Sequence, residues 1–171
     1  ISLYSFTSVG LSVLNNEFKN QTSNAAVLFD GGASHQNLVF NYNYLHTNDP
    51  GSSCVYVANN TNPEFAFNYI TSGRRGFKIA GGNSAVNIHN NIITGTVQAD
   101  IMVSTDFGAN AGIVANNNSL AISPIAIRNE DVTVVDATCN WFGSTAPATI
   151  AAKIQQTNPN NVNYIPWLIS G

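Results

Sequence analysis

The chain has 171 residues, of which 44% are hydrophobic and 9% are charged, and its formal net charge is −3. This length suits one domain with a real core, and the hydrophobic content excludes a disordered chain, which combines low hydrophobicity with high net charge. Six lysine and arginine residues without a basic run argue against a nucleic-acid partner, and no apolar run approaches the ~18 residues of a membrane-spanning helix.

The first segment, from Ile1 to Phe6, alternates apolar and polar residues as a strand does. Neither an initiator methionine nor a signal peptide precedes it. We therefore expect the chain to be a piece of a longer protein, with other domains of that protein among its partners.

A repeat with the skeleton apolar-x-apolar-x-x-Asn-x-apolar follows, first as Leu11, Val13, Asn16 and Phe18. The repeated asparagines are Asn16, Asn43, Asn68, Asn91, Asn118 and Asn140, with spacings of 27, 25, 23, 27 and 22 residues. Such a period is typical of stacked repeats. We expect each asparagine to lie at a bend with a left-handed backbone and to bond neighbouring coils through its amide. The column could serve as a binding ladder, but we favour a structural asparagine ladder.

A second series of short apolar segments interleaves with the asparagines and has nearly the same period. These segments begin at Val27, Val55, Phe77, Ile101 and Ile125. Two series with a common period predict an all-β protein, a right-handed parallel β-helix of about six coils. In this register Leu28, Tyr56, Lys78, Met102 and Ala126 form an outward column. That column is unusually apolar, so we expect a neighbouring segment to cover it.

The end of the chain has a different character. Residues 149–156 predict a short amphipathic helix, started near Ser144 and Pro147, with Ile150 and Ile154 on one face. Residues 162–168 predict a final extended segment, in which Pro166 indicates a sheet edge. We expect residues 1–144 to form the coils and residues 145–171 to form a C-terminal cap of the same domain, made of the short helix and a strand.

The segment Thr138-Cys139-Asn140-Trp141-Phe142-Gly143-Ser144, with the helix and tail that follow, resembles the C-terminal end of right-handed parallel β-helix repeat proteins. These are the pectate-lyase-like group, especially large secreted surface proteins of Bacteroidetes-type bacteria. The resemblance implies an extracellular or cell-surface location. The group includes polysaccharide lyases, glycoside hydrolases, sugar epimerases and non-enzymatic adhesin modules, so the fold does not decide the activity.

An aromatic column is the candidate binding surface. Tyr44, Tyr69 and Trp141 each follow a ladder asparagine and point outward, and Tyr42 lies nearby. Aromatic rings on a flat face could stack on sugar rings, which predicts a polysaccharide or other glycan as ligand. The alternatives are that loops or a partner domain cover the rings, or that tyrosine simply suits an exposed strand.

No catalytic pair emerges from the acidic residues. Glu64 and Asp136 share an outward column, but three coils separate them, roughly 14 Å at the usual strand spacing. That separation exceeds both glycosidase geometries, which need carboxylates about 5–10 Å apart. The acidic calcium ligands and the basic catalytic residue of the lyases have no counterpart, so we assign no catalytic residue. Glu130 and Asp131 are interpreted as a solvated turn.

The remaining polar residues suggest no cofactor. His35, His46 and His89 lie in different coils without ligand spacing, so we expect no metal site. Arg74 and Arg75 are interpreted as a surface turn.

Three coils also separate the two cysteines, Cys54 and Cys139, by roughly 14 Å, beyond the ~7 Å limit of a disulfide. We therefore expect two free thiols, with Cys139 as a small buried hydrophobe in a tight turn.

These observations favour a non-catalytic extracellular module of a bacterial secreted or surface protein, a rigid stalk or adhesive surface for carbohydrate. The alternative is a polysaccharide lyase or glycoside hydrolase of the pectate-lyase-like group. Turnover of a polysaccharide by the isolated chain would separate the two.

Overall fold

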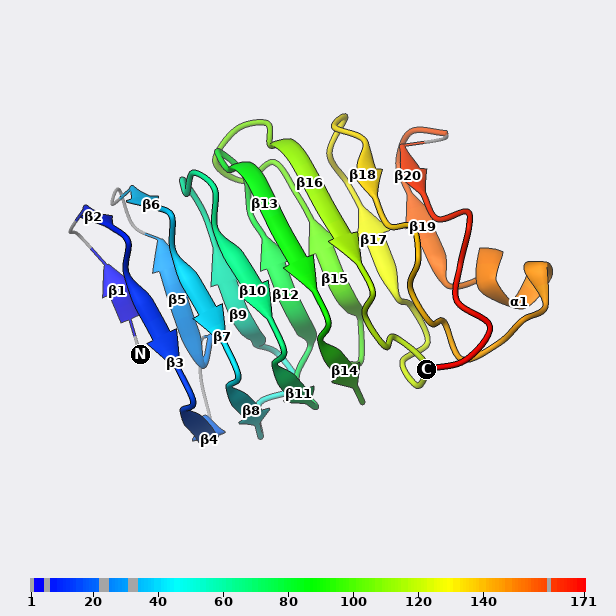
Figure 1. The fold of residues 1–171 in the computed structure, drawn as a ribbon, viewed down its shortest axis with the longest axis horizontal. Helices are drawn as coiled ribbons and strands as arrows, with labels where there is room; N and C mark the ends of the chain where they lie inside the picture. The colour runs from blue at the N-terminus through cyan, green and yellow to red at the C-terminus, as the bar shows by residue number, and fades with distance from the viewer. Residues whose placement is uncertain (1, 5–6, 22–24, 31–33, 160) are drawn as a thin grey trace.

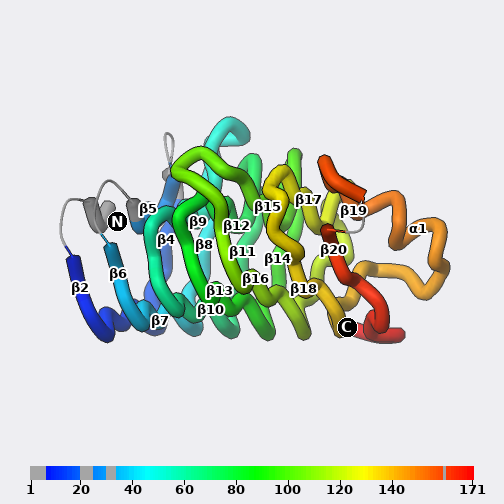
Figure 2. Tube along the Cα trace, turned by 90° about the horizontal axis from the view of Figure 1, so that it is seen from above, coloured from blue at the N-terminus to red at the C-terminus, as the bar shows by residue number. Residues whose placement is uncertain are grey.

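The computed structural model describes every residue except 1, 5–6, 22–24, 31–33 and 160. The described residues form a parallel β-solenoid of about six turns with almost no helix, which confirms the predicted fold class. Successive coils lie side by side along one axis from the N-terminal to the C-terminal end (Figures 1 and 2). All the paired strands are parallel, as they must be when each coil repeats the path of the one before.

The described residues form three larger sheets and one two-stranded sheet. Sheet A consists, in order, of β1 (Ser2–Tyr4), β5 (Val27–Asp30), β9 (Ser53–Val57), β12 (Arg75–Ile79), β15 (Ala99–Val103), β17 (Ile127–Asn129) and β19 (Ile154–Gln156). Sheet B consists of β3 (Ser12–Leu14), β7 (Val39–Asn41), β10 (Glu64–Ala66), β13 (Ser84–His89), β16 (Ala111–Asn116), β18 (Val135–Asp136) and β20 (Val162–Asn163). Sheet C consists of β4 (Glu17–Gln21), β8 (Tyr44–Thr47), β11 (Tyr69–Thr71) and β14 (Ile92–Thr94), and β2 (Ser8–Val9) pairs separately with β6 (His35–Gln36).

The core lies between the sheets and is built from columns of inward side chains. Phe29, Phe40, Phe65 and Phe77 are fully buried, and their neighbouring ring centroids lie 5.4–6.2 Å apart. The apolar positions of the repeat are buried from the second coil onward, whereas those of the first coil, Leu11, Val13 and Phe18, are partly buried and pack against the core. Burying one apolar side chain of this size contributes about 1.5–3 kcal/mol.

The asparagine ladder is confirmed. In each pair of neighbouring coils, the backbone N–H and the side-chain Nδ2 of one asparagine donate to Oδ1 of the next asparagine. For Asn43 these bonds to Asn68 measure 2.9 and 3.1 Å, and Nδ2 also donates to the carbonyl of Val13 at 2.9 Å. The buried amides thus satisfy backbone groups that the bend removes from the sheets. The left-handed residue, however, is the one before each asparagine and not the asparagine itself.

A second ladder was not predicted. Its members Asn60, Asn83 and Asn110 are buried. The N–H of Asn60 donates to Oδ1 of Asn83, and the N–H and Nδ2 of Asn83 donate to Oδ1 of Asn110, as in the first ladder. Asp131 is its next member, and Asp131 Oδ2 accepts the N–H and Nδ2 of Asn110, each at 2.8 Å. The interpretation of residues 130–131 as a solvated turn is therefore wrong for Asp131, which is 0% exposed because it continues this ladder.

The C-terminal segment differs from the prediction. Helix α1 (Pro147–Ala151) is short and has no side-chain cap hydrogen bond, and Ile154 begins β19 instead of continuing the helix. Pairing of Ile154 with Ile127 extends sheet A, and this parallel pairing outweighs the weak helical propensity of the segment. Strand β20 pairs with β18 at the edge of sheet B, as expected of an edge strand.

Two further predictions on the outer face of sheet A are wrong. Ile127 pairs with Ile101, so Arg128 occupies the outward column after Met102, whereas Ala126 is fully buried. The strand in this coil is in register with Ile101 at Ile127, two residues later than predicted. The chain between Ile101 and its partner is therefore longer than the predicted spacing. Arg75 does not lie in a surface turn, since it is the first residue of β12 and is 8% exposed.

Both cysteines are free thiols, as predicted. Cys54 is fully buried, and its Sγ lies 3.4 Å from the carbonyl of Ser72. Cys139 is half-buried in a turn with φ of 57°, so it is less enclosed than expected.

Candidate functional site

A column of residues with left-handed backbone runs along the corner between sheets B and C. Each residue directly precedes a ladder asparagine and has a φ of 55–59°. The members of this column, which we call the ridge, are Asn15, Tyr42, Phe67, Asn90, Asn117 and Cys139. The chain turns sharply here between its two strands. Asparagine tolerates this conformation well, whereas other L-residues lose about 1–2 kcal/mol.

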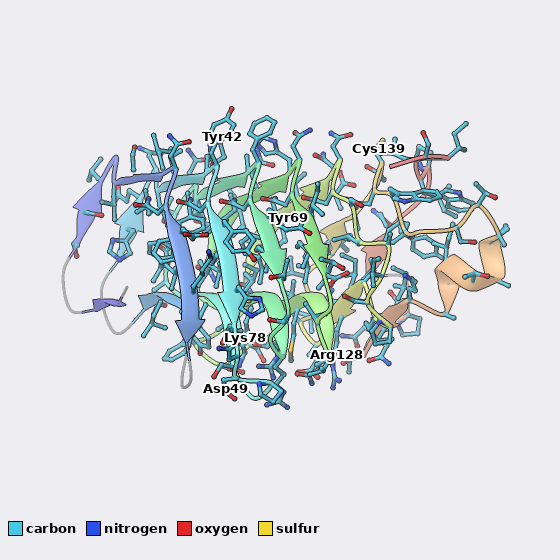
Figure 3. All side chains as sticks on the ribbon, turned by 90° about the horizontal axis from the view of Figure 1, so that it is seen from below. Tyr42, Asp49, Tyr69, Lys78, Arg128 and Cys139 are labelled. Atoms are coloured by element: carbon cyan, nitrogen blue, oxygen red, sulfur yellow. The ribbon has the colours of Figure 1, made fainter. Side chains whose placement is uncertain are left out.

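Two ridge residues are bulky aromatics, which are rare at positive φ. Tyr42 is 56% exposed and Phe67 is 45% exposed. Their rings are parallel within 4°, with centroids 4.9 Å apart, and Tyr42 projects from the edge of the molecule (Figure 3). The ring of His89 meets Phe67 edge-on, with centroids 5.9 Å apart. Backbone strain and apolar exposure therefore coincide in two successive coils.

The aromatic column predicted on sheet C lies beside the ridge. Tyr44 pairs with Tyr69, and Tyr69 pairs with Ile92. The rings of Tyr44 and Tyr69 are stacked with centroids 5.7 Å apart. Tyr69 and Ile92 are 43% and 49% exposed, whereas Tyr44 is half-buried and faces Lys19 Nζ at 5.6 Å. The backbone register thus carries Tyr44 and Tyr69 in one column, two residues along the chain from Tyr42 and Phe67.

Trp141 lies apart from the tyrosines. It continues their column through Ser119, three coils beyond Tyr69 and so roughly 14 Å away. Its half-buried ring packs against Gly171. The contact is so close that a Cβ atom added to Gly171 would lie 2.1 Å from Trp141 Cδ1. Phe67 was missed, although a signal exists in the sequence, because Phe67 precedes Asn68 as Tyr42 precedes Asn43.

Two hollows flank the ridge. A groove of about 240 Å³ lies on the sheet C side, and Phe67 and Trp141 belong to its first and last coils. Ile92 lines it between them, and the amides of Asn90 and Asn117 border it. On the sheet B side a hollow of about 580 Å³ is lined by residues that include Asn87, His89, Val114, Asn116 and Asn117. Small-molecule binding sites are usually lined by aromatic side chains together with a few polar groups such as amides.

The sheet B side also carries a negative charge beside the ridge. Glu64 Oε1 accepts a hydrogen bond from Asn41 Nδ2 at 2.7 Å and lies 3.7 Å from His89 Nε2. His89 Nδ1 is within 2.8 Å of Asn90 Oδ1 on the ridge. Glu64 and Asp136 occupy one column with Asn87 and Val114 between them, so the two carboxylates are three strands apart, as predicted.

The three histidines lie apart, but His35 in β6 and His46 in β8 belong to one turn of the solenoid, between β5 and β9, and not to separate coils as expected. His35 contacts Ser8, and His46 contacts Thr71. Across the described ranges, no group of three or more His, Cys, Asp or Glu side chains could hold a metal ion. In the same part of the chain, no helix is long and apolar enough to cross a membrane.

Comparison of the chain with protein-family models, with curated proteins and with solved structures finds no match. The parallel β-helix and its buried asparagine stacks are therefore known from the structure of this chain alone.

Proposed function

We propose that the chain is a non-catalytic module of a bacterial secreted or surface protein, related to the pectate-lyase-like group, that binds carbohydrate outside the cell. The stacked coils form a rigid stalk, and the ridge with the aromatic column beside it forms the adhesive face. Tyr42, Tyr44, Tyr69 and Phe67 offer ring surfaces, and the groove leading to Trp141 offers amide donors and acceptors. Sugars combine apolar ring faces with hydroxyl groups, which these two kinds of group complement.

One observation carries the proposal. Tyr42 and Phe67 are exposed and aromatic at left-handed positions where three other coils have asparagine. Neither the core nor the ladder needs these rings, and each costs conformational energy. Backbone strain of this kind is concentrated at functional sites, which supports a role for the rings in binding.

The test replaces each ring by the residue that the neighbouring coils use. Wild-type chain and the Tyr42→Asn and Phe67→Asn variants are applied to a glycan array, and affinity for the best ligand is measured by titration calorimetry. We expect binding by the wild type and a loss of roughly 2- to 10-fold in each variant, since one stacked ring contributes about 0.5–1.5 kcal/mol. Val9→Asn, an exposed apolar residue outside the site, is the matched control. Equal affinity in all four proteins would overturn the proposal.

The alternative, a polysaccharide lyase or glycoside hydrolase, has one observation in its favour. Glu64 and His89 lie 3.7 Å apart beside the larger hollow, and a carboxylate near a histidine can transfer protons. Release of unsaturated or reducing ends from the array ligand, abolished by Glu64→Gln, would favour the enzyme. Binding without turnover would favour the module.

A further inference from the structure

The two ends of the stack differ, because the C-terminal end is covered and the N-terminal end is open. At the C-terminal end, Ile150 of α1 is fully buried in the core (Figure 1). At the N-terminal end, β1, β3 and β4 are the last described strands of sheets A, B and C. Among the described residues, each of these strands has no neighbour on its outer side, so one row of its backbone groups is unpaired. Such edges pair readily with a strand of another chain.

The core and the asparagine ladder are also incomplete at this end. Phe18 of β4 is half-buried, and its ring stacks on Phe40 with centroids 5.9 Å apart. Leu14 of β3 is 44% exposed. Asn16 donates to Oδ1 of Asn43, but no described residue donates to Oδ1 of Asn16, whereas the later ladder oxygens each accept two hydrogen bonds. Apolar surface and an unused acceptor therefore lie together at the open end.

The charges of β4 are complementary to those of a second copy of the same strand. Phe18 packs against the core, while Glu17 and Lys19 lie on the outer face of sheet C, with Lys19 Nζ 2.5 Å from Glu17 Oε1. Both charged side chains are about half-exposed. In an antiparallel pair centred on Phe18, Glu17 of each copy lies opposite Lys19 of the other copy. Opposite charges directly across two strands are favourable, and like charges are unfavourable.

The backbone of β4 has the phase that this pairing needs. The carbonyl of Asn16 accepts the N–H of Tyr44 at 2.9 Å, so Asn16 bonds to the next coil. Because the direction of the backbone groups alternates along a strand, Phe18 also faces the next coil, and Glu17 and Lys19 turn their N–H and C=O groups to the open end. The register against β8 shifts between Phe18 and Gln21, which limits a regular pair to residues 17–19.

We propose that the N-terminal end binds a second copy of this chain, and that the two copies form a two-fold symmetric dimer through β4. The axis passes between the two Phe18 side chains and is perpendicular to sheet C, so sheet C continues from one copy into the other. The same rotation brings β1 of each copy to β3 of the other, since sheets A and B follow sheet C on either side in each coil. Such an interface is closed, because both copies use the same surface. It does not depend on carbohydrate binding at the ridge.

The test is the mass of the 171-residue chain in solution, measured by light scattering and by sedimentation over a series of concentrations. We expect a monomer–dimer equilibrium for the wild type. Glu17→Lys and Lys19→Glu each place like charges opposite one another at both symmetric positions, so each should raise the dissociation constant at least ~10-fold. Since both side chains are on the surface, the melting temperature of the monomers should stay close to that of the wild type.

Two rescue experiments separate pairing across the axis from damage to the fold. The double variant with Glu17→Lys and Lys19→Glu restores opposite charges and should dimerise within about threefold of the wild-type affinity. An equimolar mixture of the two single variants should form a heterodimer, because the lysines of one copy then face the glutamates of the other. Glu130→Lys is the matched control, since Glu130 also pairs with a residue two positions away, Arg128, and it should leave the dissociation constant unchanged.

Several results would overturn the proposal. They are a wild-type chain that stays monomeric at every concentration, a dimer that neither single variant weakens, and a mixture of the single variants that does not dimerise. Loss of the dimer in Phe67→Asn would also overturn it, because the contact would then lie at the ridge. Assemblies larger than two copies would do the same, since they would show that the interface does not close.

Discussion

Asp100 should make the protein less stable as the pH rises toward neutrality. This carboxyl group is fully buried in β15, where Oδ1 accepts a hydrogen bond from Thr96 Oγ1 at 3.0 Å and Oδ2 has no hydrogen-bond partner among the described residues. Burial raises the pKa of Asp100 to about 7, and Ser123, Thr96 and the charge of Lys153 offset only part of this rise. The native state therefore holds a proton that the unfolded chain releases.

The sign and the size of the effect follow from this shift. The unfolded pKa is near 3.8, so the contribution of the protonated group is complete below pH 3.8 and is lost as the pH rises to about 7. A shift of roughly three units at 1.36 kcal/mol per unit gives about 4 kcal/mol over this window. Asp100→Asn preserves the shape of the neutral acid and removes the ionisation.

The assay is urea unfolding between pH 4 and pH 8, followed by the fluorescence of the two tryptophans. The free energy of unfolding of Asp100→Asn minus that of the wild type should grow with pH, toward about 4 kcal/mol, and level off above pH 7. Asp49→Asn is the control, since Asp49 is half-exposed and its pKa is lowered by Ser52 and Gly51. Parallel curves for Asp100→Asn and the wild type would refute the argument, because they would mean that Asp100 titrates alike in both states.

Three other predictions concern the ladders, the ridge and the thiols. Asn91→Ala removes the oxygen that accepts the N–H and Nδ2 of buried Asn68, so it should lower the free energy of unfolding in urea by at least about 3 kcal/mol. Asn16→Ala, in the exposed first coil, should lower it by about 1 kcal/mol. Equal losses would contradict a cooperative ladder. Phe67→Asn relieves a left-handed aromatic residue and should leave the melting temperature unchanged or raise it, and a clear fall would mean that the ring is structural. Burial raises the pKa of the Cys54 thiol to about 12, so iodoacetamide should label native Cys139 well before Cys54. Mass spectrometry follows the labelling, and equal rates for both thiols would contradict the burial of Cys54 in solution.

The repeat was predictable because stacking makes equivalent residues recur. The six ladder asparagines and the inward apolar columns depend on one register, and each coil repeats the evidence of the last. The second ladder offered the same kind of signal, since Asn60, Asn83 and Asn110 each stand eight residues before a ladder asparagine. It is hard to recognise because only Asn60 keeps the spacing of the apolar skeleton, after Val55 and Val57. Asp131, nine residues before Asn140, breaks both the spacing and the residue type.

The errors have a different physical origin. Local propensity predicts a helix through Ile154, but the open end of sheet A offers a strand partner that a local pattern does not contain. The burial of Arg75 likewise depends on Met102, which is 27 residues away in sequence and in the next coil. Both are contacts between coils whose lengths differ, so the periodic pattern cannot place them to within one residue.

The ridge explains why a fold of this kind can acquire binding surfaces without loss of its framework. The inner ladder asparagines are held in place from both sides, as Asn91 is by hydrogen bonds to Asn118 and to the carbonyl of Phe65. The residue before each one only has to adopt φ near +57°, and its side chain points away from the core in the coils of Asn15, Tyr42 and Phe67. A change there from asparagine to an aromatic ring costs about 1–2 kcal/mol of local strain. Such a cost is small beside the core of the stack, so the ridge is where this chain can vary its chemistry while the coils beneath stay in register.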